Sequence, residues 1–196
     1  MRLRTLAAAA VLGLGLTLAS CDRPTPPEAE PDAPAARDAP GPLEGYSHTL
    51  MSDVSGFYMP LSAVSVGRWQ LHHLFVGRAG EFVAFEGGER SETFAPLMFE
   101  FHDMSSPRMA NEMGAEVPSI SERVLPGAYL INGEQVRFAG QHPELGPVRF
   151  EGTIDAGALA QSRRTLGGDR SAVLSGTLTV GSRTFEGQQF LWWAGD

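Results

Sequence analysis

The sequence predicts a mainly β fold, an antiparallel β-barrel or β-sandwich of about 8–10 strands with one or two short helices. Three observations predict it. Apolar and polar residues alternate or form short apolar runs over residues 68–77, 81–86 and 96–102. An Asn-Gly pair inside residues 128–139 is a strong signal for a hairpin turn. Helical patterns interrupt the strands too rarely to form β-α-β units.

Further strands are predicted at residues 148–155, 172–180 and 184–193. A phenylalanine, then Glu or Ala, then glycine occurs four times at irregular spacing, which favours bulges or turns around core aromatic residues over a solenoid repeat. These copies begin at Phe85, Phe138, Phe150 and Phe185. A barrel is slightly preferred, and some of five phenylalanines would line its interior. They are Phe82, Phe99, Phe101, Phe138 and Phe150.

Two short helices are expected. Residues 106–114 begin with Ser-Pro and end with glycine, which suits the two ends of a helix. Met109 and Met113 would form an apolar stripe packed on the sheet. Residues 155–164 begin with a capping aspartate and end with two arginines, which favour a helix C-terminus.

The first residues of the chain have the pattern of a secretory signal. Two arginines precede an uncharged apolar run over residues 6–18, which is shorter than the roughly 20 residues that span a bilayer. The sequence Leu-Ala-Ser-Cys then ends at Cys21, the single cysteine. This stretch resembles the lipobox of bacterial lipoproteins. The resemblance implies that residues 1–20 are a cleaved signal peptide and that Cys21 carries a diacylglycerol and further acyl chains such as palmitate.

Residues 21–45 contain seven prolines and almost no large apolar side chain, which predicts a disordered tether after the lipidated cysteine. Residues 46–196 would then form one β-rich globular domain. The lipobox resemblance places the protein in the bacterial cell envelope, anchored to a membrane and facing the periplasm. The sequence leaves both the inner and the outer membrane open.

Composition excludes several kinds of chemistry. With Cys21 used as the anchor, the domain has no thiol for a disulfide, a thiolate metal site or a cysteine nucleophile. All 15 basic residues are arginine, which excludes Schiff-base and P-loop lysines. The domain carries 11 arginines against 17 acidic residues and no dense basic cluster, so we expect no nucleic-acid partner. No cofactor is predicted.

The histidines and methionines offer candidates for a metal site. His102 and Met104 lie two residues apart, so a strand would place them on one face, where they could bind soft copper. His72 and His73 are neighbours in a predicted strand and are expected to point to opposite faces, which would prevent them from sharing one metal ion. His142 is expected in a solvated turn, and His48 has no evident partner.

The leading hypothesis is a membrane-anchored envelope lipoprotein whose β domain binds an envelope protein or a small apolar ligand without catalysis. A periplasmic enzyme, such as a hydrolase, is one alternative, although neither a nucleophile elbow nor a zinc-protease helix motif occurs. A soft-metal (copper) binding lipoprotein is the other. Trp192 and Trp193 would face opposite sides of a strand, and an outward tryptophan could contact a partner.

Overall fold

The computed structural model describes residues 41–112, 114–166, 168 and 170–195. The predicted signal peptide, Cys21 and residues 22–40 of the predicted tether lie outside these residues. Within them, no helix is both long enough and apolar enough to cross a membrane.

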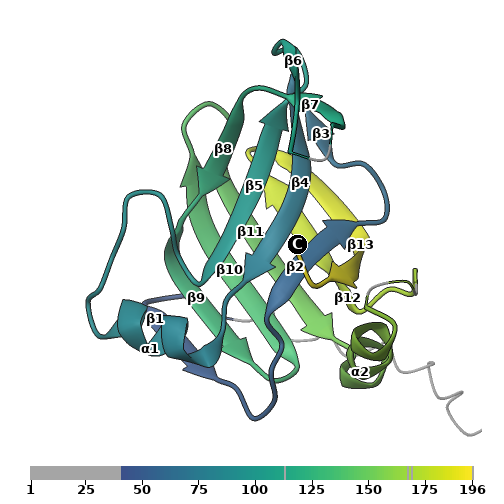
Figure 1. The fold of residues 1–196 in the computed structure, drawn as a ribbon. Coiled ribbons are helices and arrows are strands. Elements are labelled where there is room, and N and C mark those ends of the chain that lie inside the picture. The colour runs from purple at the N-terminus through teal and green to yellow at the C-terminus, as the bar shows by residue number, and fades with distance from the viewer. Residues whose placement is uncertain (1–40, 113, 167, 169, 196) are drawn as a thin grey trace, which may run out of the picture. The chain divides into compact units, whose positions relative to one another are not determined.

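The described residues form an eleven-stranded sheet that curls into a half-barrel (Figure 1). Ten strands follow one path, β1-β9-β10-β11-β12-β13-β2-β4-β5-β8, and β3 pairs with β4 beside it. The pairs are antiparallel except that of β1 with β9. The strands are β1 (Tyr46–Thr49), β2 (Gly56–Pro60), β3 (Ser65–Val66), β4 (Trp69–Val76), β5 (Leu97–Asp103), β8 (Ser121–Val124), β9 (Pro126–Asn132), β10 (Gln135–His142), β11 (Gly146–Ile154), β12 (Leu174–Val180) and β13 (Arg183–Trp193). The predicted β fold is confirmed.

The two ends of this path are joined by the chain itself. β8 is the last strand of the path and β9 the second, yet Leu125 alone separates them in the sequence. β8 pairs with β5, whereas β9 pairs with β10 and β1. The stretch from β8 to β9 therefore serves both ends of the curled sheet, which explains how the sheet encloses a core.

Aromatic side chains fill the interior. The ring centroid of Phe99 of β5 lies 5.0 Å from that of Phe138 of β10 and 5.8 Å from that of Phe150 of β11, and both contacts are edge-to-face. Phe150 in turn meets Phe190 of β13 at 5.6 Å. All four rings are buried, and burying one phenylalanine contributes about 1.5–3 kcal/mol. Phe82 and Phe101, the other two expected core rings, are also buried.

Two of the repeated Phe-x-Gly sequences create room for their own rings. A Cβ atom at Gly152 would lie 2.5 Å from the ring of Phe150, and one at Gly140 would lie 2.8 Å from the ring of Phe138. The expected bulges occur at Gly140 and in the β12–β13 pair beside Gly187, whose φ is +61°. Gly152 lies instead in regular β11, where its missing side chain admits the ring.

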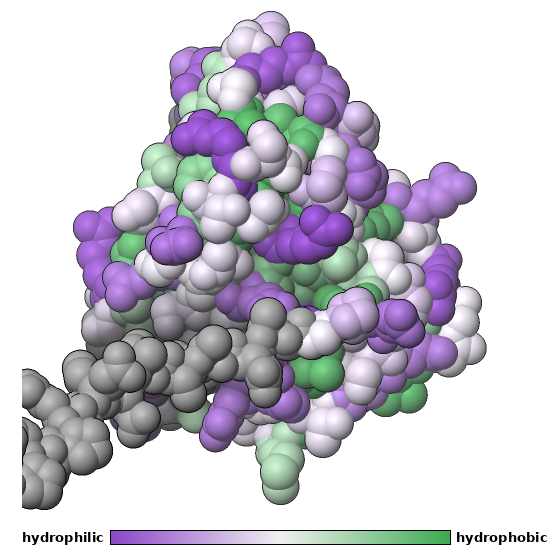
Figure 2. All heavy atoms as spheres, turned by 180° about the vertical axis from the view of Figure 1, so that it is seen from behind, coloured by the Kyte–Doolittle hydropathy of each residue, from purple (hydrophilic) through white to green (hydrophobic). Residues whose placement is uncertain are grey.

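The outer surface follows from strand alternation. Arg149, Glu151 and Thr153 of β11 are exposed and alternate along the strand with buried Val148, Phe150 and Ile154. Figure 2 shows the molecule from behind, with hydrophilic and hydrophobic residues interspersed over that face. The alternation along β11, with polar side chains outside and apolar side chains inside, is typical of a sheet that has one buried face.

Residues 81–86 form part of a helix, α1 (Ala79–Glu86), so the prediction of a strand there was wrong. The side chain of Glu81 accepts a hydrogen bond from the backbone N–H of Arg78 at 2.6 Å, which stabilises the first turn. Phe82 and Phe85, three residues apart, lie on the buried face and both contact the ring of Tyr129. In a helix, residues three apart lie on the same face, so both rings reach the core. In a strand the two rings would point to opposite faces.

Residues 106–114 form no helix, which contradicts the second prediction. The chain instead makes a two-stranded hairpin of β6 (Arg108–Ala110) and β7 (Glu116–Pro118). Asn111 closes the turn, because its side-chain oxygen accepts from the N–H of Ala115 at 2.8 Å. Met109 is 54% exposed rather than packed on the sheet, and Met113 lies outside the described residues.

The other predicted helix is confirmed as α2 (Ala156–Arg164). Asp155 caps it by accepting from the N–H of Ala158 at 2.9 Å. Arg163 and Arg164 occupy its last turn.

Candidate functional site

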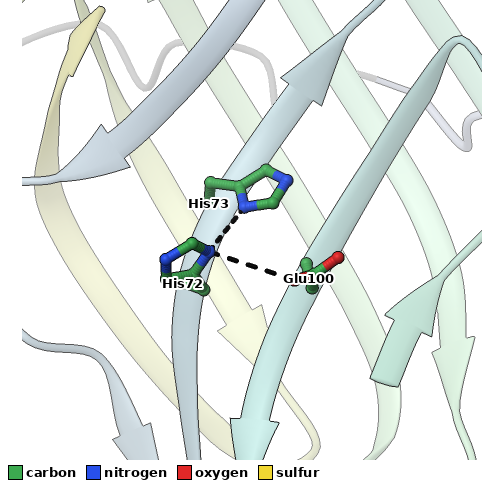
Figure 3. A group of neighbouring side chains, drawn as sticks. All are labelled: His72, His73 and Glu100. Carbon is green, nitrogen blue, oxygen red and sulfur yellow. Dashed lines mark hydrogen bonds and ion pairs between the residues drawn. The ribbon is translucent and has the colours of Figure 1, made fainter. Parts of the chain in front are cut away.

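A bulge in β4 brings His72 and His73 together on the outer face of the sheet. In the register with β5, Leu71 lies opposite Phe101 and His73 opposite Glu100, so His72 is an extra residue. The Nδ1 atoms of the two histidines are 2.8 Å apart (Figure 3). The expectation that these side chains point to opposite faces was wrong, because the bulge breaks the alternation on which it depended.

Glu100 and His102 reach the same place from β5. They alternate with buried Phe99 and Phe101 and therefore point outward. His102 Nε2 donates to Glu100 Oε1 at 3.2 Å, and its ring stacks on that of His72 at 4.1 Å. Glu100 Oε1 also lies 4.0 Å from His72 Nδ1. Three imidazoles and one carboxylate thus form one cluster, which we call the histidine cluster: His72, His73, Glu100 and His102.

The surroundings of the histidine cluster set the charges of its members. Burial opposes ionisation of Glu100, but hydrogen bonds from His102 and Arg123 outweigh it and lower the pKa of this carboxyl to about 2. Burial lowers the pKa of His73 to about 4. Burial and the neighbouring His102 also lower the pKa of His72. At neutral pH the cluster therefore contains a carboxylate beside two uncharged imidazoles, His72 and His73.

Both metal candidates identified in the sequence lie near this cluster. His102 belongs to it, and Met104 lines an adjoining cleft of about 200 Å³ together with His72 and His102. Arg108 and Glu116 of the β6–β7 hairpin form another wall of this cleft. No local signal in the sequence connects Glu100 to His72 and His73.

A second, larger cleft of about 460 Å³ lies among β2, β4, α2 and the end of β13. The rings of Phe57, Phe75 and Trp192 line it. Four charged side chains also line it, those of Asp53, Arg78, Glu81 and Arg163. We call it the aromatic cleft. The ring of Phe57 also contacts His73 at 4.9 Å, so the aromatic cleft and the histidine cluster are neighbours.

One wall of the aromatic cleft is held by polar contacts from distant parts of the chain. Arg163 donates to Asp53 Oδ2 at 2.9 Å and to the carbonyl oxygen of Ser55 at 2.7 Å, and its guanidinium lies 5.0 Å from the Trp192 ring. The indole N–H of Trp192 donates to the same carbonyl at 2.9 Å. Burial opposes ionisation of Asp53, but hydrogen bonds from Arg163 and Ser55 lower the pKa of its carboxyl to about 2.

Glycine is required at the base of this wall. Gly56 has a φ of +140°, and a Cβ atom there would lie 2.2 Å from the indole nitrogen of Trp192. Trp192 is buried, whereas Trp193 is half-buried and contacts Phe57 at 6.0 Å, so the two tryptophans face opposite sides as strand alternation predicts.

The remaining histidines have structural partners. His142 is fully buried, and its Nδ1 accepts from the backbone N–H groups of Glu144 and Leu145, both at 3.1 Å. The prediction of a solvated turn was therefore wrong for this side chain. His48 lies 2.9 Å from a carboxylate oxygen of Glu86 and stacks on Phe82, although the sequence suggested no partner.

Comparison with known proteins gives no relative: no family model, curated protein or solved structure matches the chain. The functional conclusion therefore depends on the geometry and chemistry of the residues themselves.

Proposed function

We propose that this protein is a membrane-anchored lipoprotein of the bacterial cell envelope whose β domain binds a small apolar ligand without catalysis. One observation carries the proposal for the domain. The interior is filled by aromatic rings, whereas an aromatic-walled cleft of about 460 Å³ opens outside it. Ligand sites for small molecules commonly have volumes of about 300–1,000 Å³ and apolar walls with a few polar groups.

The character of the aromatic cleft defines the class of ligand. Phe57, Phe75 and Trp192 offer ring faces and edges that suit an aromatic or aliphatic body. The two arginines of the lining, Arg78 and Arg163, are balanced in number by two acidic residues, Asp53 and Glu81, and Arg163 is paired with Asp53. We therefore infer an uncharged, mainly apolar ligand rather than a strongly anionic one.

The proposed location draws on the sequence ending at Cys21, which resembles a lipobox. Two or more acyl chains give stable anchoring, whereas a single chain binds a membrane only marginally. The proline-rich residues that follow would hold the domain away from the membrane and facing the periplasm.

Ligand binding can be measured on the indole N–H of Trp192, with indole as a soluble apolar probe. In nitrogen-15 NMR spectra of the full chain in detergent, indole should shift this resonance in a saturable way. Phe75→Ala should weaken binding because it removes one wall of the cleft, whereas Leu61→Ala, an exposed apolar position outside the lining, should not. Equal binding by both variants, or no shift of Trp192, would contradict the proposal.

Anchoring has a separate test. When the chain is expressed in a bacterium supplied with radiolabelled palmitate, we expect label on the protein and none on the Cys21→Ser variant. Ser20→Ala keeps a small residue before the cysteine and should still be labelled. Label that persists in Cys21→Ser would exclude lipidation at this residue.

The alternative of a periplasmic hydrolase has one observation in its favour, the contact between His102 and Glu100, since a carboxylate can orient a histidine base. That imidazole donates its Nε2 proton to the carboxylate and stacks on His72, and no nucleophilic hydroxyl is among these contacts. The pair therefore supports catalysis less well than the aromatic cleft supports binding.

A further inference from the structure

We propose that the outer face of β4 and β5 carries a binding site for one divalent first-row transition-metal ion, with His72, His73 and Glu100 as its protein ligands. One ligand atom from each of the three residues lies within 4.8 Å of the other two. Figure 3 shows that the two imidazoles come from one strand and the carboxylate from its neighbour. This site goes beyond the proposed apolar ligand and depends on none of the evidence for it.

The distances between the donor atoms are close to those around a bound ion. Two ligands at about 2.1 Å from one ion are about 3.0 Å apart at a right angle and about 3.4 Å apart at a tetrahedral angle. The Nδ1 atoms of His72 and His73 are 2.8 Å apart, and His72 Nδ1 lies 4.0 Å from Glu100 Oε1. No two of the three ligand atoms are more than 4.8 Å apart, so side-chain movements of up to about 1.5 Å suffice for coordination.

The contact between the two histidines suits replacement of a proton by a metal ion. At 2.8 Å, one Nδ1 donates a proton to the other, so the pair shares one hydrogen. An ion bound by both Nδ1 atoms would take the place of this hydrogen. The ring that loses the Nδ1 proton regains one at Nε2 from solvent, so both imidazoles stay neutral and no net proton is released.

The carboxylate is already positioned by partners that leave one oxygen oriented toward the histidines. Arg123 donates its Nε–H to Glu100 Oε2 at 3.0 Å, and His102 donates to Oε1 at 3.2 Å. The contact from His102 is of a kind that commonly fixes the orientation of a ligand in metal sites, whereas the guanidinium of Arg123 also brings a positive charge close to the carboxylate. His102 is thus a positioning residue in this site, and Arg123 can keep Oε2 while Oε1 turns toward the ion.

The ligand types define the class of ion. Two imidazoles and one carboxylate suit Zn²⁺ or Cu²⁺, whereas thiolate and thioether ligands select Cu⁺. The proposed ligand set contains no sulfur, so it differs from the soft-copper hypothesis based on His102 and Met104. The side chain of His72 is 40% exposed, which leaves a route for the ion and for a water molecule as a further ligand.

Zinc binding by the full chain in detergent tests the site. The protein is purified without a polyhistidine tag, dialysed against Zn²⁺, and its metal content is measured by mass spectrometry. We expect one equivalent in the unmodified chain. The His72→Gln and His73→Gln variants should each lose more affinity than the roughly 10–100-fold typical of residues that only orient a ligand.

Two further variants separate ligation from a general effect of removing histidines. His102→Gln should weaken zinc binding by about tenfold, as expected for a positioning residue. His48→Gln is the matched control, because His48 is partly buried beside a carboxylate elsewhere in the domain, and its zinc affinity should equal that of the unmodified chain.

Cobalt provides a readout that needs no variant. Co²⁺ added to the unmodified chain should give visible absorption bands of a site with nitrogen and oxygen ligands, and Zn²⁺ should remove them. The proposal is overturned if the unmodified chain binds neither ion, or if a His72→Gln/His73→Gln double variant with the same circular dichroism spectrum retains one equivalent of zinc. Failure of indole binding at Trp192 would leave this result unaffected, so the two proposals are distinguishable.

Discussion

His73 lies directly opposite Glu100 in the β4–β5 register, and the residue before it, His72, lies on the same side of the sheet. The bulge at His72 therefore determines which side chains can meet. Without the extra residue, normal alternation would place one of the two imidazoles in the core. The pairing of β4 with β5, and not only the types of residue, therefore determines which side chains form the histidine cluster.

Acid should destabilise the domain through His73. Burial lowers the pKa of this imidazole from 6.5 to about 4, so the unfolded chain binds a proton more readily than the folded one. The contribution of His73 to the free energy of unfolding is fully present above pH 6.5 and is lost as the pH decreases from 6.5 toward 4. The free energy of unfolding should therefore be lower by about 2 kcal/mol at pH 5 than at pH 8. Urea unfolding of the unmodified chain and of His73→Gln at both pH values measures this, and the variant should lose less stability on acidification. An equal loss in the two proteins would contradict the assignment.

Adding one methyl group at Gly152 should destabilise the core. A Cβ atom there would lie 2.5 Å from the Phe150 ring and 2.8 Å from the carbonyl oxygen of Ser175. We expect Gly152→Ala to lower the free energy of unfolding by about 1–3 kcal/mol, as overpacking commonly does. In contrast, Gly80→Ala adds a methyl group to α1 where no heavy atom lies within 4 Å, and it should raise stability by about 0.5–1 kcal/mol. Urea unfolding of both variants should give opposite signs.

The hydroxyl of Tyr129 should stabilise the contact between α1 and the sheet. It donates to Glu86 Oε1 at 2.9 Å, and burial together with this carboxylate raises the pKa of the phenol. Tyr129→Phe should cost about 1.5–3 kcal/mol, the range for a hydrogen bond to a charged group. Tyr46→Phe removes a longer bond to the uncharged carbonyl of Pro126, at 3.2 Å, and should cost less. Thermal unfolding of the two variants would contradict this account if their order were reversed.

Removing the positive charge beside the histidine cluster should strengthen the proposed zinc site. Arg123 is held between Glu100 and the carbonyl oxygen of Thr93, where it repels a cation and occupies one carboxylate oxygen. We expect Arg123→Gln to raise zinc affinity by about fivefold, a modest effect because the guanidinium is half-exposed and screened by water. Arg149→Gln, an exposed position on β11, is the control and should leave the affinity unchanged in calorimetry. Weaker binding by Arg123→Gln would indicate that Arg123 orients Glu100 more than it repels the ion.

Most of the sheet could be predicted because local patterns agreed with the final pairing. The Asn-Gly turn after β9 and the alternation in β11 each specify a strand without reference to distant residues. The α1 segment could not be assigned in this way, since Phe82 and Phe85 become a helical face only when Tyr129, more than 40 residues away, provides the surface for it.

The histidine cluster and the hairpin show a different limit. Whether His72 and His73 share a face depends on a one-residue shift between β4 and β5, and no residue near them signals that shift. In residues 106–114 the capping signals for a helix are present, but the side chain of Asn111 bonds to the backbone and closes a turn instead. A side chain such as that of Asn111 can bond to the backbone in a turn in place of the hydrogen bonds of a helix, and the surrounding structure decides between the two.

The position of β1 has a mechanical consequence. β1 is the first strand of the described residues, lies at one end of the sheet path, and pairs with β9 over four residues from Tyr46 to Thr49. Under the proposed anchoring, any tension between the membrane and the domain would be applied through the chain that enters β1. The hydrogen bonds of this short edge strand would bear that load first, whereas the rings of the core belong to strands further along the sheet path. Single-molecule pulling from the N-terminus should therefore detach β1 before the rest of the domain unfolds.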